Sequence, residues 1–153
     1  MEPESPIEYD PNLIKKRTVS FSVEGKPFGK QRPRFVRKGK FVQTYTPKET
    51  ADYEKHVRKS YIGTCGKDKL NVPVSAELEA IFPIPKSVSK KKRQEMLDNN
   101  ILPTVKPDTD NIVKAVLDSL NKVAYDDDAG VVEVKVIKRY GENGKVNVKL
   151  KEL

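Results

Sequence analysis

The sequence has very few of the residues that build zinc sites and disulfide frameworks. It contains one cysteine, Cys65, and one histidine, His56. A structural zinc site normally combines several Cys and His ligands, and a disulfide needs two cysteines, so this chain forms neither by itself. A lone cysteine is typical of proteins from a reducing compartment.

Long apolar runs are also absent. No stretch approaches the roughly 20 apolar residues that a membrane-spanning helix needs. The first residues, MEPESPIEYDPN, lack the basic and then apolar profile of a secretory signal. We therefore expect no membrane association and a cytoplasmic location.

The length and polarity of the chain predict one domain with a short tail. Its 153 residues are 36% apolar and 34% charged, with a mean hydropathy of -0.67. Residues 1–17 contain three prolines and show no periodicity, which predicts a flexible N-terminal tail. Residues 18–153 are expected to form a single domain.

Positive charge is concentrated in two parts of the sequence. The net charge is +8, and the stretch 15–59 has fourteen Lys and Arg against four acidic residues. A second basic cluster comprises Lys86 and residues 90–93. Basic surface beside a compact acidic segment suggests a bound polyanion and a separate metal site. The alternative is a solvated surface of lysines without a partner.

Hydrophobic periodicity predicts an α+β fold, with a mixed sheet of about five strands packed against two or three helices. Alternation predicts strands at 19–23, 72–82, 131–138 and 145–150, with hairpins at 35–45 and across the GENG turn at 141–144. Helices are expected from Thr46 to about residue 62, over 87–99 with Ser89 as a cap, and after Asp108. Thr46, Pro47 and Glu49 match a capping box, and glycines should end that first helix before a loop that holds Cys65.

The segment 106–128, KPDTDNIVKAVLDSLNKVAYDDD, concentrates the candidate catalytic residues. Asp108 and Asp110 follow Pro107, where an extended chain projects both carboxylates to one side. Asp128 arrives at the start of the next strand, so three carboxylates can form an open site for Mg²⁺ or Mn²⁺. Lys114, one helical turn after Asp110, would neutralise charge on a reacting phosphate or orient the attacking water.

Each of these residues also has a purely structural interpretation. Asp108 can be a helix N-cap, and Asp110 with Lys114 can be an ordinary ion pair one turn apart. The three aspartates at 126–128 can form a solvated turn.

The same segment resembles the signature of RusA-type Holliday junction resolvases, a family common in prophages. The matching stretches are KPDTDN at 106–111, Lys114, DSL at 118–120, DDA at 127–129, KQRPR at 30–34 and YTP at 45–47. One departure is visible, because the acidic run of the family usually continues with Gln where this chain has Gly130.

The resemblance implies a small homodimeric α+β nuclease, bacterial or phage-encoded, that uses Mg²⁺ to nick four-way DNA junctions symmetrically. By position, Asp108, Asp110 and Asp128 correspond to the essential acidic residues of the family. Lys114 corresponds to its essential lysine, and Asp127 to the adjacent acid that joins the metal ligands.

Branched DNA is therefore the expected partner, and a DNA endonuclease the expected enzyme. The best candidates for phosphate contacts are Lys30, Arg32 and Arg34, and Phe35 or Tyr45 could stack on an unpaired base. His56 is expected to be a surface residue. Two other functions remain open: a catalytically silent protein that binds DNA junctions, and a basic RNA-binding accessory protein.

Overall fold

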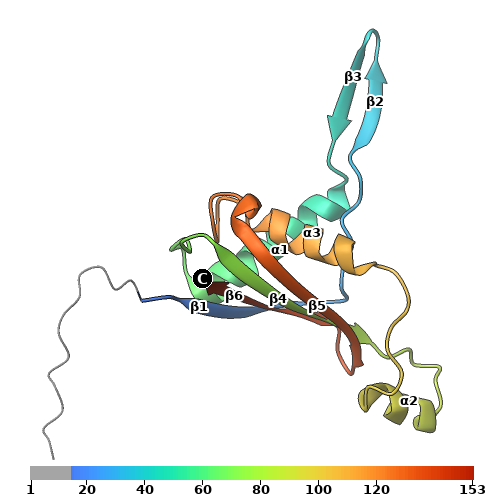
Figure 1. Cartoon of the computed structure of the whole chain (residues 1–153). Helices are drawn as coiled ribbons and strands as arrows, with labels where there is room; N and C mark the ends of the chain where they lie inside the picture. The colour runs from blue at the N-terminus through green and yellow to red at the C-terminus, as the bar shows by residue number, and fades with distance from the viewer. Residues whose placement is uncertain (1–14) are drawn as a thin grey trace, which may run out of the picture.

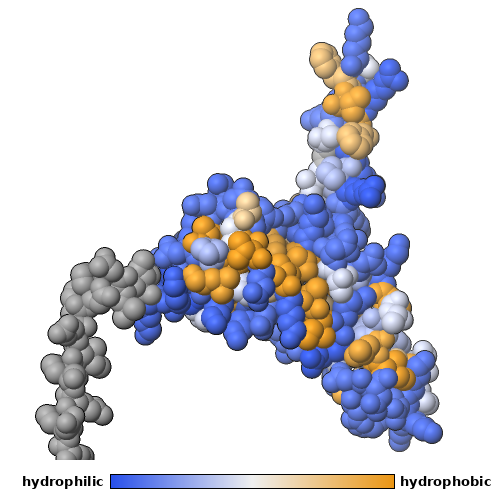
Figure 2. Space-filling model, in the orientation of Figure 1, coloured by the Kyte–Doolittle hydropathy of each residue, from blue (hydrophilic) through white to orange (hydrophobic). Residues whose placement is uncertain are grey.

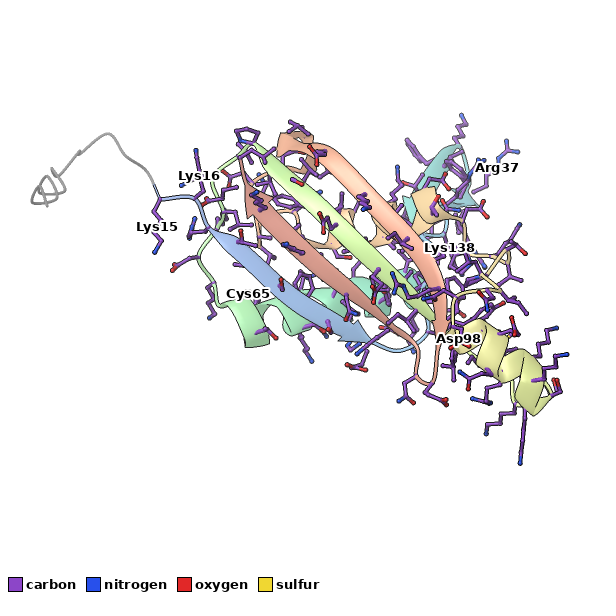
Figure 3. All side chains as sticks on the ribbon, turned by 60° about the horizontal axis from the view of Figure 1, so that its bottom comes forward. Lys15, Lys16, Arg37, Cys65, Asp98 and Lys138 are labelled. Carbon is purple, nitrogen blue, oxygen red and sulfur yellow. The ribbon has the colours of Figure 1, made fainter. Side chains whose placement is uncertain are left out.

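Alternating side chains build a four-stranded mixed sheet in the computed structural model, which describes residues 15–153. The strands are β1 (Thr18–Glu24), β4 (Val74–Pro83), β5 (Val131–Gly141) and β6 (Lys145–Glu152). They lie in the order β1-β6-β4-β5 (Figures 1 and 3), with β4 and β5 parallel and the other neighbours antiparallel. The predicted α+β fold with a mixed sheet is confirmed.

Within residues 15–153, three α-helices accompany the sheet: α1 (Lys48–Cys65), α2 (Lys90–Leu97) and α3 (Thr109–Ser119). A short 3₁₀ helix, η1, spans Asp128–Gly130. Helices α1 and α3 cover one face of the sheet, and α2 lies at the end of the domain (Figure 1). Within the described residues, no helix is long and apolar enough to cross a membrane.

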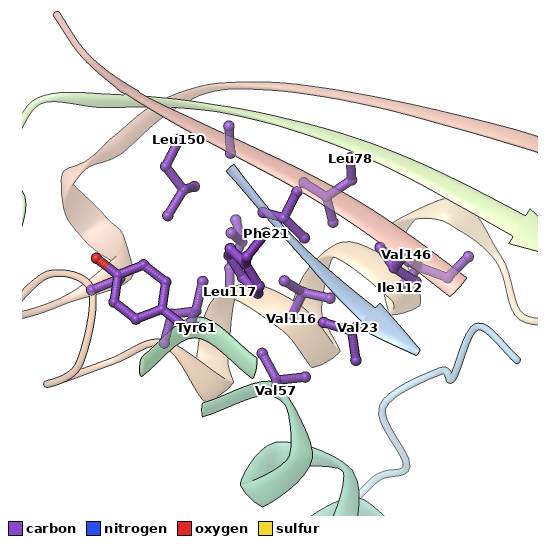
Figure 4. Packing of buried hydrophobic residues seen from close by; sticks show 14 of the residues in the cluster. Phe21, Val23, Val57, Tyr61, Leu78, Ile112, Val116, Leu117, Val146 and Leu150 are labelled. Atoms are coloured by element: carbon purple, nitrogen blue, oxygen red, sulfur yellow. The ribbon is translucent and has the colours of Figure 1, made fainter. Parts of the chain in front are cut away.

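The core lies between the sheet and helices α1 and α3. Phe21, Leu78 and Val146 of the strands lie in one cluster with Val57 of α1 and Val116 of α3, and all five are buried (Figure 4). Burying an aliphatic or aromatic side chain of this size stabilises the fold by about 1.5–3 kcal/mol. The alternation that predicted the strands therefore also identifies which side chains of each strand face the core.

A separate two-stranded hairpin projects from the domain. It consists of β2 (Arg34–Lys38) and β3 (Phe41–Tyr45), which pair only with each other among the described strands. Figure 1 shows it standing clear of the sheet and helices. The predicted hairpin at 35–45 is thus present.

The expected start and end of α1 were wrong in detail. Pro47, and not Thr46, occupies the N-cap, and no side chain makes a capping hydrogen bond there. Glu49 instead accepts a hydrogen bond from Gln31 Nε2 at 3.0 Å, which links the helix to the basic loop. The helix continues to Cys65, so this residue is helical, and Gly66 with φ of 84° ends it.

The expected hairpin across residues 141–144 was also wrong. Strands β5 and β6 do not pair, because β4 lies between them and bonds to both. The connection crosses the end of β4, where Ile84 N donates to Gly141 O at 3.1 Å. The apolar strand β4 is buried in the sheet and has a neighbouring strand on each side. A hairpin of β5 and β6 would instead leave β4 at an edge of the sheet.

Most of the predicted N-terminal tail, residues 1–14, lies outside the described residues. Arg17 is bonded to the domain, because its backbone N and guanidinium both donate to the Glu152 carboxylate at the other end of the chain.

Candidate active site on helix α3

Helix α3 carries a charged row on the face opposite its buried one. Asp110, Lys114 and Asp118 recur at every fourth residue, whereas Ile112 and Val116 are buried in the core. Asp108 occupies the N-cap position, but its side chain makes no capping hydrogen bond. Its carboxylate is exposed and is not used for capping the helix.

The chain after α3 folds back and brings Asp128 beside this row. Tyr125 is fully buried, and its hydroxyl donates to Leu117 O of α3 at 2.7 Å. Asn121 Oδ1 then accepts a hydrogen bond from the backbone N of Asp128 at 2.8 Å. These two bonds tie the start of η1 to the end of α3 and explain how a carboxylate ten residues beyond Asp118 returns to it.

Asp118, Asp127 and Asp128 influence one another's pKa values at this end of α3. The hydrogen bond shared with Asp118 raises the pKa of Asp128 to about 6, and partial burial and Asp127 act in the same direction. Burial opposes the change at Asp118, but hydrogen bonds to Lys30 and Asp128 and the charges of Lys30 and Lys114 lower its pKa. The hydrogen bond from Ala129 N lowers the pKa of Asp127. A cation at this cluster would relieve the repulsion that Asp128 meets.

The charged face therefore has two acidic groups. Asp108 and Asp110 lie at the start of α3, and Asp118, Asp127 and Asp128 lie at its end. A helix rises about 1.5 Å per residue, so the two groups are roughly 12 Å apart along its axis. No three Asp, Glu, His or Cys side chains within residues 15–153 are arranged as a ready metal site. The convergence of Asp108, Asp110 and Asp128 on one ion stays a prediction.

The donor chemistry nevertheless fits a hard divalent cation. Every acidic side chain along this face is an aspartate, and carboxylate oxygens are the preferred protein ligands of Mg²⁺ and Mn²⁺. Asp108, Asp110, Asp127 and Asp128 are the residues that would hold it.

The basic loop before the hairpin packs directly against α3. Gly29 is needed for this approach, because a Cβ at residue 29 would lie 2.7 Å from Pro107 Cβ. Lys30 N donates to Asn111 O at 3.2 Å, and Lys30 Nζ forms an ion pair with Asp118 Oδ2 at 2.5 Å. Lys30 is therefore held by the acidic row, unlike the exposed Arg32 and Arg34 of the same predicted DNA-binding set.

A cavity of about 420 Å³ lies between this loop and the start of α3. Its lining includes three lysines, Lys26, Lys30 and Lys106, together with Asp108 and Asn111. Cationic side chains attract phosphate, and the Asp108 carboxylate lies in the same cavity as a predicted metal ligand. The arrangement can hold a phosphodiester next to a divalent cation.

Asp118 and Asn121 lie beside the candidate site and were not among the predicted site residues. Asp118 continues the row of Asp110 and Lys114 at the next fourth residue, and this spacing was the available signal. Nothing in the local sequence marks Asn121, because its role depends on the return of the chain at Asp128. Of the other singled-out residues, His56 is exposed as expected, and its Nε2 lies 2.7 Å from Glu24 O.

Gly130 has a steric explanation in this structure. A Cβ at residue 130 would lie 2.2 Å from Val72 Cγ1 and 2.8 Å from Val72 Cβ, so the valine occupies the space of a side chain. A side chain at residue 130 would therefore require Val72 or the backbone to move.

Replacing Gly130 with Ala should lower the free energy of unfolding by about 1–2 kcal/mol, because Val72 or the backbone must move. Adding Val72→Ala removes the closest atom and should recover part of this loss in a double-mutant cycle measured by urea unfolding. Gly63→Ala is the matched control, since nothing lies within 4 Å of a Cβ there and alanine favours the α1 helix. Strictly additive effects of the two substitutions would contradict the coupling.

A family model and one relative both match most of this chain. The family model described as "Endodeoxyribonuclease RusA" matches residues 24–151. The Bacillus subtilis (strain 168) protein "Uncharacterized protein YqaN" is 38% identical over 138 residues, which is 88% of this chain and 96% of the relative. The matched region contains the whole charged row of α3, the basic loop and η1.

Proposed function

Because the chain belongs to the RusA endodeoxyribonuclease family, we propose that it is a Mg²⁺-dependent endonuclease that resolves four-way DNA junctions by paired symmetric nicks. The observation that carries this proposal is that Asp108, at the N-cap of α3, lines the same cavity as Lys26, Lys30 and Lys106. Cleaving such junctions would serve recombination and repair of intracellular DNA.

In this proposal, the residues of the site have different roles in phosphodiester hydrolysis. Asp108, Asp110 and Asp128, with Asp127 beside them, would hold one or two Mg²⁺ ions. The bound metal would supply Lewis acidity and lower the pKa of a coordinated water. Lys114 stabilises the negative charge that develops on the phosphate, and Lys30 keeps Asp118 ionised next to Asp128.

Arg32 and Arg34 lie on the exposed side of the docked loop and bind the DNA backbone in this proposal. Their contacts would be independent of base sequence and would weaken as salt rises.

A junction with two opposed strands to cut calls for two sites related by a two-fold axis, and we propose that the chain is a homodimer. Strand β5 offers a surface for the second copy, because it is an edge strand of the sheet. Val132 and Val134 on it are 63% and 43% exposed, and Figure 2 shows an apolar stripe over this strand between hydrophilic borders. An exposed apolar edge is a ready template for pairing with another chain.

Val134→Lys should convert the dimer to a monomer, because a charge at an apolar edge opposes strand pairing. Sedimentation velocity at several protein concentrations measures the change. Val105→Lys is the control, since Val105 is similarly exposed but lies in the loop before α3. A Val134→Lys protein that stays dimeric would exclude β5 as the interface.

The direct test of the proposed activity uses a four-way junction labelled on each strand in turn, incubated with the purified protein in Mg²⁺ or in EDTA. Nicks at symmetric positions in two opposed strands, formed only with Mg²⁺, are expected. Binding without any nick in Mg²⁺ would instead support the silent junction-binding protein.

Competition among the junction, a linear duplex and a structured RNA over a salt titration distinguishes the junction resolvase from the RNA-binding alternative. A junction resolvase should keep its preference for the junction as salt rises. A non-specific polyanion binder should lose all three ligands together.

A further inference from the structure

The β2–β3 hairpin exposes large apolar side chains that contribute nothing to the core. Phe35 is 72% exposed, Phe41 is 79% exposed and Val42 is 64% exposed. Every residue of β2 is exposed, so the ribbon has two open faces. Exposed aromatic residues on a projecting element usually mark a binding surface.

The charge of this element identifies the class of partner. Between Glu24 and Glu49 the chain has eight Lys and Arg residues and no acidic residue. Figure 2 shows apolar atoms of the hairpin between hydrophilic ones, and Figure 3 shows Arg37 on this element. A surface with cations and no anions is complementary to the backbone of a nucleic acid.

The strand register places cations and apolar side chains together on each face. Lys38 pairs with Phe41 and Arg37 pairs with Val42, and paired residues of an antiparallel ribbon point to the same side. A phosphate held by the cation would therefore bring a neighbouring base close to the apolar partner. Phe41 is the first residue of β3, directly after the turn at the tip of the ribbon.

The hairpin is also connected to the candidate active site at its base. It follows directly from the loop whose Lys30 is bonded to Asn111 and Asp118 of α3. Five strand residues extend about 17 Å, so the tip lies roughly that far from the base of the hairpin.

We propose that the hairpin is a wedge for branched DNA: Phe41 stacks on bases left unpaired at the branch point, while Arg37, Lys38 and Lys40 bind the flanking phosphates. This inference rests on the proposed function for its DNA substrate. Stacking of an aromatic ring on a base tolerates any sequence, because every base has a flat face. The wedge therefore selects the branch and not the sequence around it.

The test measures binding in EDTA, so that cleavage does not interfere, with a junction that carries 2-aminopurine at the branch point. Wild-type protein should quench the 2-aminopurine fluorescence by stacking. Phe41→Ala should lose the quenching and bind the junction about 5- to 150-fold more weakly, the range for removing one stacking contact. Phe41→Trp should restore both.

Two controls separate stacking from general effects. Affinity of Phe41→Ala for a linear duplex should stay within about two-fold of wild type, since a duplex offers no unpaired base. Leu102→Ala, which truncates an exposed apolar residue in the loop before α3, should change neither signal. Thermal unfolding should be the same for all variants, because Phe41 lies outside the core.

The outcomes for the wedge and for the nuclease are distinguishable. Undiminished quenching and junction affinity in Phe41→Ala would overturn the wedge, as would an equal loss on junction and linear duplex. Quenching by a wild-type protein that nicks no junction in Mg²⁺ would support the wedge and overturn the nuclease.

Discussion

Replacing Asp110 with Asn is expected to slow Mg²⁺-dependent nicking of a four-way junction by about 10³-fold or more. The substitution keeps the size of the side chain but removes a carboxylate from the start of α3, where a divalent cation is expected to bind. Junction binding in EDTA should be unchanged or tighter, because one negative charge that repels DNA is gone. Single-turnover cleavage and equilibrium binding measure the two effects separately.

The matched control for this experiment is Asp52→Asn, which removes an exposed carboxylate from α1. It should leave the cleavage rate within about two-fold of wild type, as expected for a surface charge away from the site. Cleavage at the wild-type rate by the Asp110→Asn protein would refute the assignment of the active site.

Measuring the cleavage rate of Asp118→Asn in the same assay distinguishes the roles of the acidic groups at the two ends of α3. A loss as large as that of Asp110→Asn would place Asp118 among the functional carboxylates. A small loss would assign it to holding Lys30, with which it forms the 2.5 Å ion pair.

Replacing Glu152 with Gln should give the largest loss of stability, about 2–3 kcal/mol in the free energy of unfolding. Glu152 is only 3% exposed, and its carboxylate accepts hydrogen bonds from the backbone N of Arg17 and of Asn71 and from the Arg17 guanidinium. It thereby joins the end of β6 to the start of β1 and to the loop before β4. The Gln side chain would place its NH₂ group, a hydrogen-bond donor, against the N–H donors of Arg17 and Asn71.

The effect of Glu152 should depend on pH in the acid range. The hydrogen bond from Arg17 lowers the pKa of Glu152 to about 2, from the ordinary value of 4.5. A lowered pKa of an acid stabilises the folded state above pH 4.5, and this stabilisation is lost as the pH falls towards 2. Urea unfolding at pH 7 and at pH 2.5 should therefore show a smaller difference between wild type and Glu152→Gln at the lower pH.

Glu142→Gln is the control, because Glu142 forms an exposed ion pair with Arg93 at 3.0 Å. Exposed ion pairs contribute about 0–1 kcal/mol, so its loss should be small at both pH values. An equal loss in the two variants would show that the buried carboxylate has no special role.

Local sequence patterns predicted most of the strands and helices and the charged face of α3. The alternation of Val19, Phe21 and Val23 predicted β1, and the spacing of Ile112 and Val116 predicted which face of α3 is buried. The same helical period placed Asp110, Lys114 and Asp118 in one row. These patterns depend on neighbours a few residues apart, and the tertiary fold leaves them unchanged.

Local sequence patterns did not predict the contacts between distant segments. The GENG segment at 141–144 has the composition of a hairpin turn, yet β5 and β6 flank β4, because the most apolar strand lies in the centre. Lys30 was expected to bind DNA, and the packing of Gly29 against Pro107 places it on Asp118. Neither result can be predicted from the residues around GENG or around Lys30 alone.

The sequence by itself determined the acidic and basic segments, the strands, α3 and the family to which the chain belongs. The tertiary structure alone decided that Asp128 returns to Asp118, that Val72 fills the space beside Gly130, and that Phe41 stays outside the core. The physical reason is one of range. Backbone propensity and side-chain periodicity act over a few residues, whereas burial and charge pairing depend on which distant segments the core brings together.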